Sequence, residues 1–170
     1  VAGDKGVGQF IMHADGRWFY KVDNDAQEVQ GLKSGESFTE TLTIHSADGT
    51  AHTLTVHVNG SDDKPTIDVG TTQSVTEDGT QTASGSITTS DLDKADTATL
   101  TPINNQAGQY GHLTLQANGQ WTYTLDNGNA NVQDLKDGQT VQDTFTITST
   151  STDGSVTTQT LTVNVQGSTD

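Results

Sequence analysis

The chain has 170 residues, of which 29% are hydrophobic and 17% charged, and its formal net charge at pH 7 is -15. Seven basic against 22 acidic residues give a surface that repels phosphate, which excludes nucleic acid and anionic membranes as partners and favours cations. No cysteine is present, so neither a disulfide nor a thiolate metal site can support the fold. No apolar run approaches the roughly 20 residues that a membrane-spanning helix needs, so membrane insertion is not expected.

Two segments of the chain share one sequence pattern. Matching residues recur at a constant offset: Trp18 and Trp121, Tyr20 and Tyr123, Leu32-Lys33 and Leu135-Lys136. The period is about one small domain long, too long for a solenoid unit. We therefore expect residues 1–62 to form a truncated β-sandwich repeat and residues 63–170 to form a complete one.

Apolar residues alternate with polar ones in runs bounded by Gly and Asp, which predicts half-buried strands arranged in four hairpins. In chain order the hairpins join 10–12 to 18–22, 42–44 to 54–58, 113–115 to 121–125 and 145–147 to 161–165. A three-residue loop that ends in a left-handed glycine keeps the apolar face continuous across each hairpin. The loops are Ala14-Asp15-Gly16, Ala47-Asp48-Gly49, Ala117-Asn118-Gly119 and Thr152-Asp153-Gly154.

Three further strands are expected in the second unit, over residues 67–76, 82–89 and 98–103. Together with the two hairpins they give about seven strands, the number of an immunoglobulin-like sandwich. No helix longer than one turn is expected. The predicted fold class is all-β, with tandem immunoglobulin-like β-sandwich domains of Greek-key topology.

The first unit has no counterpart of residues 65–103, so it lacks at least its first two strands. Its sheets then have open edges, and unpaired strand edges recruit partners. Either upstream sequence completes this unit or its edges pair with another copy of the chain. A neighbouring repeat of the same chain is expected beside each unit.

Carboxylates are concentrated where the topology brings chain ends together. A strand that leaves the linker near Pro65 and a strand that returns to it would place five carboxylates at one pole, namely Asp62, Asp63, Asp91, Asp93 and Asp96. Glu77 and Asp78 fall at the opposite pole, where they would face Asp170 at the joint with a following unit. Ca²⁺ takes six to eight oxygen ligands in flexible geometry, so we predict calcium sites at these joints. The predicted metal ligands are Asp62, Asp63, Glu77, Asp91, Asp93, Asp96 and Asp170.

The simpler interpretation of Asp91 to Asp96 is a solvated turn, because aspartate is favoured in turns for its hydrogen bonds to the backbone.

The second unit carries a set of motifs that occur together. They are Gly-x-Leu-x-Leu-x-Ala-Asn-Gly-x-Trp-x-Tyr-x-Leu-Asp-Asn at 111–127, Val-Gln-Asp-Leu-Lys-Asp-Gly at 132–138, Asp-Thr-Phe at 143–145 and a closing Gly-Ser-x-Asp in each unit. This set resembles the VCBS-type repeat of large bacterial surface adhesins of the RTX class. The segment Gly60 to Pro65 is similar to that family's linkers, with Asp62 where asparagine is usual.

The resemblance implies tandem cadherin-like sandwiches that extend an adhesin from the bacterial cell surface. It further implies calcium as the stiffening ion at the linkers, export by type I secretion, an extracellular location and a role in biofilm attachment. No catalytic activity is implied.

Other functions have weaker support. Histidines at 13, 45, 52 and 57 suggest a transition-metal site, but strand parity keeps any three from converging.

A hydrolase is not indicated, because the chain has no Gly-x-Ser-x-Gly. The repeated Trp and Tyr could form a platform that stacks on sugars, but they have the same strand parity as the apolar residues, so a role in the core is favoured. Outward threonines at 144, 146, 148, 158, 160 and 162 favour, as the second function, a module that recognises carbohydrate or another surface.

Overall fold

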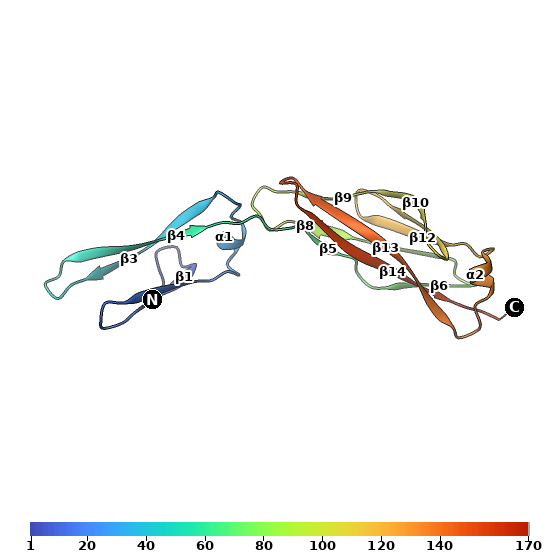
Figure 1. Ribbon diagram of the computed structural model, residues 1–170, viewed down its shortest axis with the longest axis horizontal. Helices are drawn as coiled ribbons and strands as arrows, with labels where there is room; N and C mark the ends of the chain where they lie inside the picture. The colour runs from blue at the N-terminus through green and yellow to red at the C-terminus, as the bar shows by residue number, and fades with distance from the viewer. Residues whose placement is uncertain (170) are drawn as a thin grey trace. The chain divides into compact units, whose positions relative to one another are not determined.

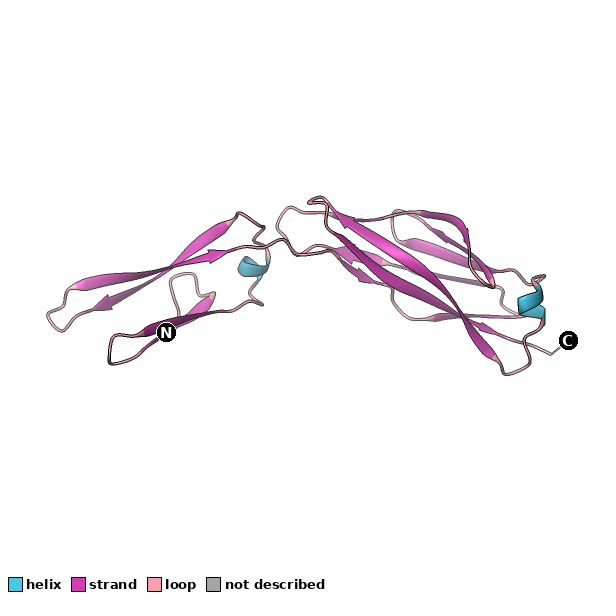
Figure 2. Ribbon diagram, viewed as in Figure 1, coloured by secondary structure: helices cyan, strands magenta, loops and turns pink. Residues whose placement is uncertain are grey.

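The structure, a computed structural model that describes residues 1–169, consists almost entirely of β-strands (Figure 2). Its contacts divide the chain into two compact units, described separately below. Unit 1 comprises Val1–Asp63 with Leu92–Ala95, and unit 2 comprises Lys64–Asp91 with Asp96–Asp170. The helices are single turns, α1 over Gln27–Gln30 and α2 over Ala130–Gln133, as the sequence predicted. In the described part of the chain, no helix is long and apolar enough to span a bilayer.

Unit 2 contains two four-stranded sheets and one short ladder (Figure 1). The first sheet has the order β10 (Ile103–Ala107), β11 (Gly111–Leu115), β12 (Gln120–Leu125) and β7 (Thr82–Ser86). The second has the order β6 (Gln73–Thr76), β14 (Val156–Gln166), β13 (Thr140–Ser151) and β9 (Ala98–Leu100). The ladder pairs β5 (Thr66–Asp68) with β8 (Thr88–Ser90). Every pairing is antiparallel except that of β14 with β6, so the all-β sandwich prediction is confirmed for this unit.

The core of unit 2 follows the predicted alternation. On β12, Trp121, Tyr123 and Leu125 are buried while the residues between them are exposed. On β13 and β14 the odd-numbered residues around Phe145 and Val163 are buried in the same manner. A strand exposes alternate side chains on opposite faces, so one apolar face per sheet is enough to build this core.

All four hairpin loops adopt the predicted three-residue form. In each, the residues that flank the loop form a hydrogen bond, such as that from Gln116 N–H to the Gln120 carbonyl at 2.8 Å. The last loop residue is a glycine with positive φ in every case: +88° at Gly16, +83° at Gly49, +89° at Gly119 and +92° at Gly154. The even spacing of apolar residues across each loop therefore identified both the turn and its register.

The three additional strands are shorter than predicted. The segment 67–76 divides into β5 and β6, which belong to different sheets, around Gly70 with its φ of +70°. The segment 82–89 divides at Ile87, and 98–103 divides before β10, where Pro102 has no N–H to donate to a ladder. The prediction of three continuous strands was wrong because each segment passes from one sheet to another.

Unit 1 consists of two separate hairpins. β1 (Gly8–Met12) pairs with β2 (Trp18–Val22), and β3 (Ser37–His45) pairs with β4 (Ala51–Asn59). No third strand joins either hairpin among residues 1–169. Phe10, Glu40 and Val58 are buried, but Trp18 is 37% exposed although its counterpart Trp121 is 2% exposed. The prediction that the repeated tryptophan is a core residue is thus confirmed in unit 2 and wrong in unit 1.

Candidate metal centre

Three aspartates form an acidic cluster in the loop between β8 and β9. Carboxylate oxygens of Asp91, Asp93 and Asp96 all lie within 4.8 Å of one another. Asp93 is 3% exposed, while Asp91 and Asp96 are half-buried. The loop thus holds three carboxylates close together, where their negative charges repel one another.

Backbone and side-chain contacts hold this loop in its turned conformation. Ala95 has a φ of +68°, a left-handed conformation that reverses the chain within the loop. The Asp96 carboxylate accepts a hydrogen bond of 2.9 Å from the Thr152 hydroxyl, and that hydroxyl oxygen accepts one of 3.2 Å from Thr97 N–H. Within unit 1, Lys94 N–H donates to the Gly31 carbonyl at 2.9 Å.

The linker approaches Asp93 with a carboxylate and with a backbone N–H. An oxygen of the Asp62 carboxylate lies within 4.8 Å of one on Asp93. Asp63 donates its N–H to Oδ2 of Asp93 at 2.7 Å, and Asp62 Oδ1 accepts from Ser34 N–H at 2.8 Å. The structure therefore brings Asp93 close to Asp62, and separately gathers Asp91, Asp93 and Asp96 in one loop. The contact made by the Asp63 backbone was not predicted.

The chemistry of this donor set suits a hard cation. The clustered side chains offer carboxylate oxygens and no imidazole or thiolate, which fits Ca²⁺ or Mg²⁺ and not a softer transition metal. Ca²⁺ needs six to eight oxygens, and carboxylates that bind through one or both oxygens supply several from few residues. Asp91, Asp93 and Asp96 are the residues that would hold it.

Glu77 lies at the other end of unit 2, directly after β6. It is 1% exposed, and its carboxylate accepts from Gln133 Nε2 and from Ser168 N–H, both at 3.1 Å. The neighbouring Asp78 exchanges hydrogen bonds with Asn127, at 3.2 Å from its own N–H and at 2.8 Å to its carboxylate. The predicted ligand Asp170 lies outside the described residues. Among those described, Glu77 belongs to no cluster of three metal-ligating side chains.

Two buried acids that sequence reasoning missed have a structural role. Asp143 is 1% exposed and accepts three backbone N–H groups, those of Gln109, Tyr110 and Gly111, at 2.9 to 3.2 Å. It also accepts the Tyr123 hydroxyl at 2.9 Å. Burial, and then this hydrogen bond, raises the pKa of Tyr123 far above its ordinary value.

Unit 1 repeats this arrangement at the matching positions. Buried Glu40 accepts the Tyr20 hydroxyl and, at 2.9 Å, the N–H of Gly6. Burial and Glu40 likewise raise the pKa of Tyr20. The repeat offset that relates Tyr20 to Tyr123 also relates Glu40 to Asp143, and this was the signal that could have identified both pairs.

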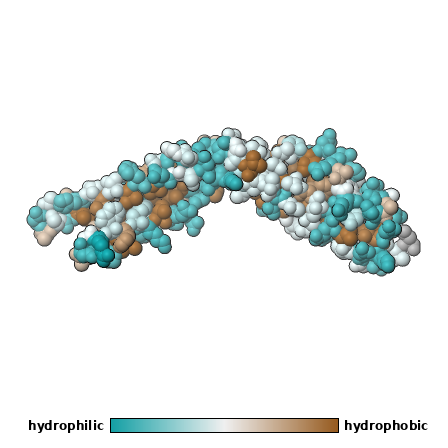
Figure 3. All heavy atoms as spheres, viewed as in Figure 1, coloured by the Kyte–Doolittle hydropathy of each residue, from teal (hydrophilic) through white to brown (hydrophobic). Residues whose placement is uncertain are grey.

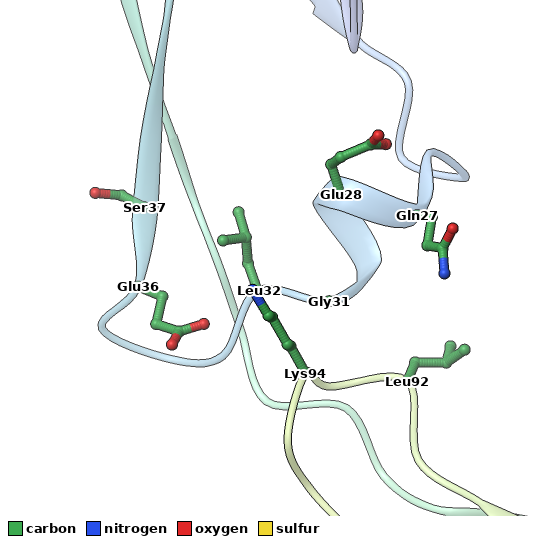
Figure 4. A pocket seen from close by; sticks show the side chains of 8 residues that line it. All are labelled: Gln27, Glu28, Gly31, Leu32, Glu36, Ser37, Leu92 and Lys94. Carbon is green, nitrogen blue, oxygen red and sulfur yellow. The ribbon is translucent and has the colours of Figure 1, made fainter. Parts of the chain in front are cut away.

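A shallow pocket of about 710 Å³ lies within unit 1, beside α1 (Figure 4). Its lining residues are Gln27, Glu28, Gly31, Leu32, Glu36, Ser37, Leu92 and Lys94. No histidine lines it. His45, His52 and His57 are exposed, and no histidine joins a metal-ligating cluster in the described part of the chain.

One protein family and several solved structures are similar to parts of this chain. The family described as bacterial cadherin-like domain matches residues 62–167. A comparison with curated protein sequences finds no match. Similar solved structures include Drosophila N-cadherin EC1-4, with 14% identity, 94% of this chain and 38% of that chain covered and a TM-score of 0.43. The Protocadherin GammaB4 extracellular domain is 15% identical, with 97% of this chain and 25% of that chain covered and a TM-score of 0.42. Mouse Protocadherin-24 EC1-3 is 16% identical, with 98% of this chain and 55% of that chain covered and a TM-score of 0.40. The chain thus spans about a quarter to about half of each of these structures.

Proposed function

The chain belongs to the bacterial cadherin-like domain family, whose members are adhesion-type modules, typically extracellular and generally non-catalytic, and we propose that it is a calcium-stiffened extender repeat of a bacterial cell-surface adhesin. In this role the domain carries an adhesive tip away from the cell in biofilm attachment. The VCBS-type motifs around Trp121 support an RTX-class parent that is exported by type I secretion. The neighbouring repeats of the same chain are its main partners.

The acidic loop Asp91 to Asp96 carries this proposal. Its carboxylates lie within 4.8 Å of one another in a chain with a net charge of -15, so their mutual repulsion destabilises the loop until a cation neutralises it. Asp93 also accepts the backbone N–H of Asp63 from the linker. A calcium ion held by Asp91, Asp93 and Asp96 therefore fixes the side chain of Asp93. Because Asp93 already contacts the linker, the ion also restricts the linker's backbone.

Calcium-dependent melting tests the proposal. The melting temperature is measured by calorimetry in excess Ca²⁺, in excess Mg²⁺ and in EDTA. A ligand at a hundred times its Kd stabilises the folded state by about 2.7 kcal/mol, which raises the melting temperature by several degrees. We expect this rise with Ca²⁺ and a smaller one with Mg²⁺, which tolerates irregular geometry poorly. Equal melting in Ca²⁺ and EDTA would rule the proposal out.

A second function is supported by the outer face of β13 and β14. Cross-strand pairs of threonines line this face: Thr144 with Thr162, Thr146 with Thr160 and Thr148 with Thr158. They form a regular array of hydroxyls without charge, which is suited to carbohydrate or another uncharged surface. Binding to a glycan array that is lost on replacing Thr146 and Thr160 with valine, without a change in melting temperature, would favour this function over the extender.

A further inference from the structure

Asparagine stands directly before glycine at three places in the chain. The pairs are Asn59-Gly60, Asn118-Gly119 and Asn127-Gly128. In such a pair the backbone nitrogen of the glycine can attack the side-chain amide of the asparagine, because glycine has no Cβ to hinder the approach. The attack releases ammonia and leaves a cyclic imide, which water opens to aspartate or isoaspartate. The surrounding fold determines which of the three pairs can react.

The attacking nitrogen is held by a hydrogen bond in two of the three pairs. Gly119 N–H donates to the Gln116 carbonyl at 3.0 Å, and Gly60 N–H donates to the Glu36 carbonyl at 2.8 Å. Among residues 1–169, the N–H of Gly128 has no acceptor. A backbone hydrogen bond that must break before the attack slows the reaction by about tenfold. The nitrogen of Gly128 reacts without this cost.

The space around the glycine separates the pairs in the same way. A Cβ on Gly119 would lie 2.0 Å from the Ile87 carbonyl oxygen, and one on Gly60 would lie 2.3 Å from the Lys33 carbonyl oxygen. At Gly128 an added Cβ would meet nothing within 4 Å. The exposed Gly128 precedes α2, at an end of unit 2 where hydrophilic residues cover much of the surface (Figure 3). This loop therefore has room for ring closure and access to water.

Two donors around Asn127 stabilise the charges that develop during the reaction. Gln133 Nε2 donates to the Asn127 carbonyl at 2.7 Å, and Asp78 N–H donates to Asn127 Oδ1 at 3.2 Å. The first bond favours loss of the proton from Gly128 nitrogen, because that peptide group then carries negative charge on its oxygen. The second stabilises the charge on Oδ1 when the nitrogen adds to Cγ.

We propose that Asn127 is a site of spontaneous deamidation, which places a second carboxylate beside Asp78. The nitrogen of Gly128 gives its proton to the solvent and bonds to Cγ of Asn127, and the Cγ–Nδ2 bond breaks as the amino group takes up a proton and leaves as ammonia. Water then adds to one imide carbonyl and breaks its bond to the same nitrogen, which regains a proton. None of these residues belongs to the candidate metal centre, so the two proposals stand or fall separately.

The modification removes a contact that supports the turn between β6 and β7. In the unmodified chain Asn127 Nδ2 donates to the Asp78 carboxylate at 2.8 Å. A carboxylate at position 127 has no proton to donate, and its negative charge repels that of Asp78. Asp78 has a φ of +55°, a conformation that needs such support in a residue other than glycine. The modified chain therefore carries one more negative charge and a less stable unit 2.

Peptide mapping of the full chain by mass spectrometry tests the site. The protein is kept in mildly alkaline buffer, either folded or in urea above its unfolding midpoint. In the folded chain Asn127 should convert about tenfold or more faster than Asn118 and Asn59. In urea the three rates should become similar, because the fold no longer restrains the glycine nitrogens. Isoaspartate at position 127, detected by enzymatic methylation, should accompany aspartate and identify the imide route. Similar rates for all three pairs in the folded chain would overturn the proposal.

Two variants test the effect on stability. Asn127→Asp has the charge of the product and should lower the melting temperature of unit 2 by about 4–8 °C. Asn118→Asp adds the same charge and should leave the melting temperature unchanged. Aspartate stands at the matching position of the other three hairpin loops, where its carboxylate accepts a backbone N–H: Asp15, Asp48 and Asp153. Equal melting of the two variants would overturn the proposed effect of the modification.

Discussion

Asp63 donates its backbone N–H to Oδ2 of Asp93 at 2.7 Å, and this bond connects the linker to the acidic loop. It occupies one carboxylate oxygen of a residue that is 3% exposed and that also lies within 4.8 Å of Asp91 and Asp96. A residue with both roles should respond differently to loss of its charge and loss of its hydrogen bond. Asparagine in its place separates the two, because the amide oxygen still accepts the N–H while the negative charge is removed.

Asp93→Asn should therefore weaken calcium binding without unfolding the metal-free protein. We expect the affinity for Ca²⁺, measured by calorimetric titration, to fall by about tenfold or more, equivalent to at least ~1.4 kcal/mol. The control is Asp68→Asn on β5, an exposed aspartate whose side chain accepts Gly70 N–H at 2.9 Å. This control removes the same charge and should leave the affinity nearly unchanged. Equal losses of Ca²⁺ affinity in the two variants would contradict this role of Asp93, because the affinity would then depend only on the net charge of the protein.

Gly119→Ala and Gly154→Ala should differ in their effect on stability although both glycines have positive φ. At Gly154 an added Cβ meets nothing within 4 Å, so only the left-handed backbone conformation opposes alanine, at a cost of about 1–2 kcal/mol. At Gly119 the Cβ would lie 2.0 Å from the Ile87 carbonyl oxygen, which adds ~1–3 kcal/mol of steric strain. Urea denaturation followed by circular dichroism measures the difference, and equal free energies of unfolding would contradict it.

Unit 2 should lose stability in alkali because Tyr123 must remain protonated. Burial and the bond to Asp143 raise the pKa of Tyr123 in the folded state. This contribution is fully present below the unfolded tyrosine pKa of about 10 and is lost as the pH rises above it toward the folded pKa. Urea midpoints, followed through the Trp121 indole signal, should decline above about pH 10 in the parent. The decline should be shallower in Tyr123→Phe, while Tyr110→Phe, which keeps the Tyr123–Asp143 bond, should retain it.

Asp143→Ala should be among the most damaging substitutions in unit 2. It leaves three buried or partly buried N–H groups and the Tyr123 hydroxyl without their acceptor. Each unsatisfied buried group costs about 1–3 kcal/mol, so a total loss of several kcal/mol in the free energy of unfolding is expected. Thr144→Ala on the exposed face of the same strand should change it by about 0.5 kcal/mol or less. Chemical denaturation of both variants is the measurement, and a loss below about 1 kcal/mol for Asp143→Ala would contradict this role.

The sequence was sufficient to predict the hairpins and much of the acidic loop. A three-residue loop ending at Gly119 keeps Leu115 and Trp121 on the same face, and the structure adopts it. The return of Asp93 toward Asp62 followed from strand direction alone. Both features depend on local spacing or on the order of strands, which a sequence contains directly.

Other features depend on contacts that no local pattern encodes. The division of the predicted strand 67–76 around Gly70 reflects which sheet each half joins, and the residues on either side are equally suited to both. The bond from Asp63 to Asp93 uses a backbone N–H, which every non-proline residue has. The buried acids Glu40 and Asp143 resembled exposed strand residues until the tyrosine opposite each was known. Tertiary contacts determine all three.

The central claim is that calcium stiffens the linker between units, and ¹⁵N relaxation of the full chain tests it most directly. Rotational correlation times are measured separately for amides of β3 and β4 in unit 1 and of β13 and β14 in unit 2, in excess Ca²⁺ and in EDTA. We predict one common, longer correlation time for both units with Ca²⁺, and shorter, unequal times in EDTA. Correlation times that are the same in Ca²⁺ and in EDTA would contradict the account.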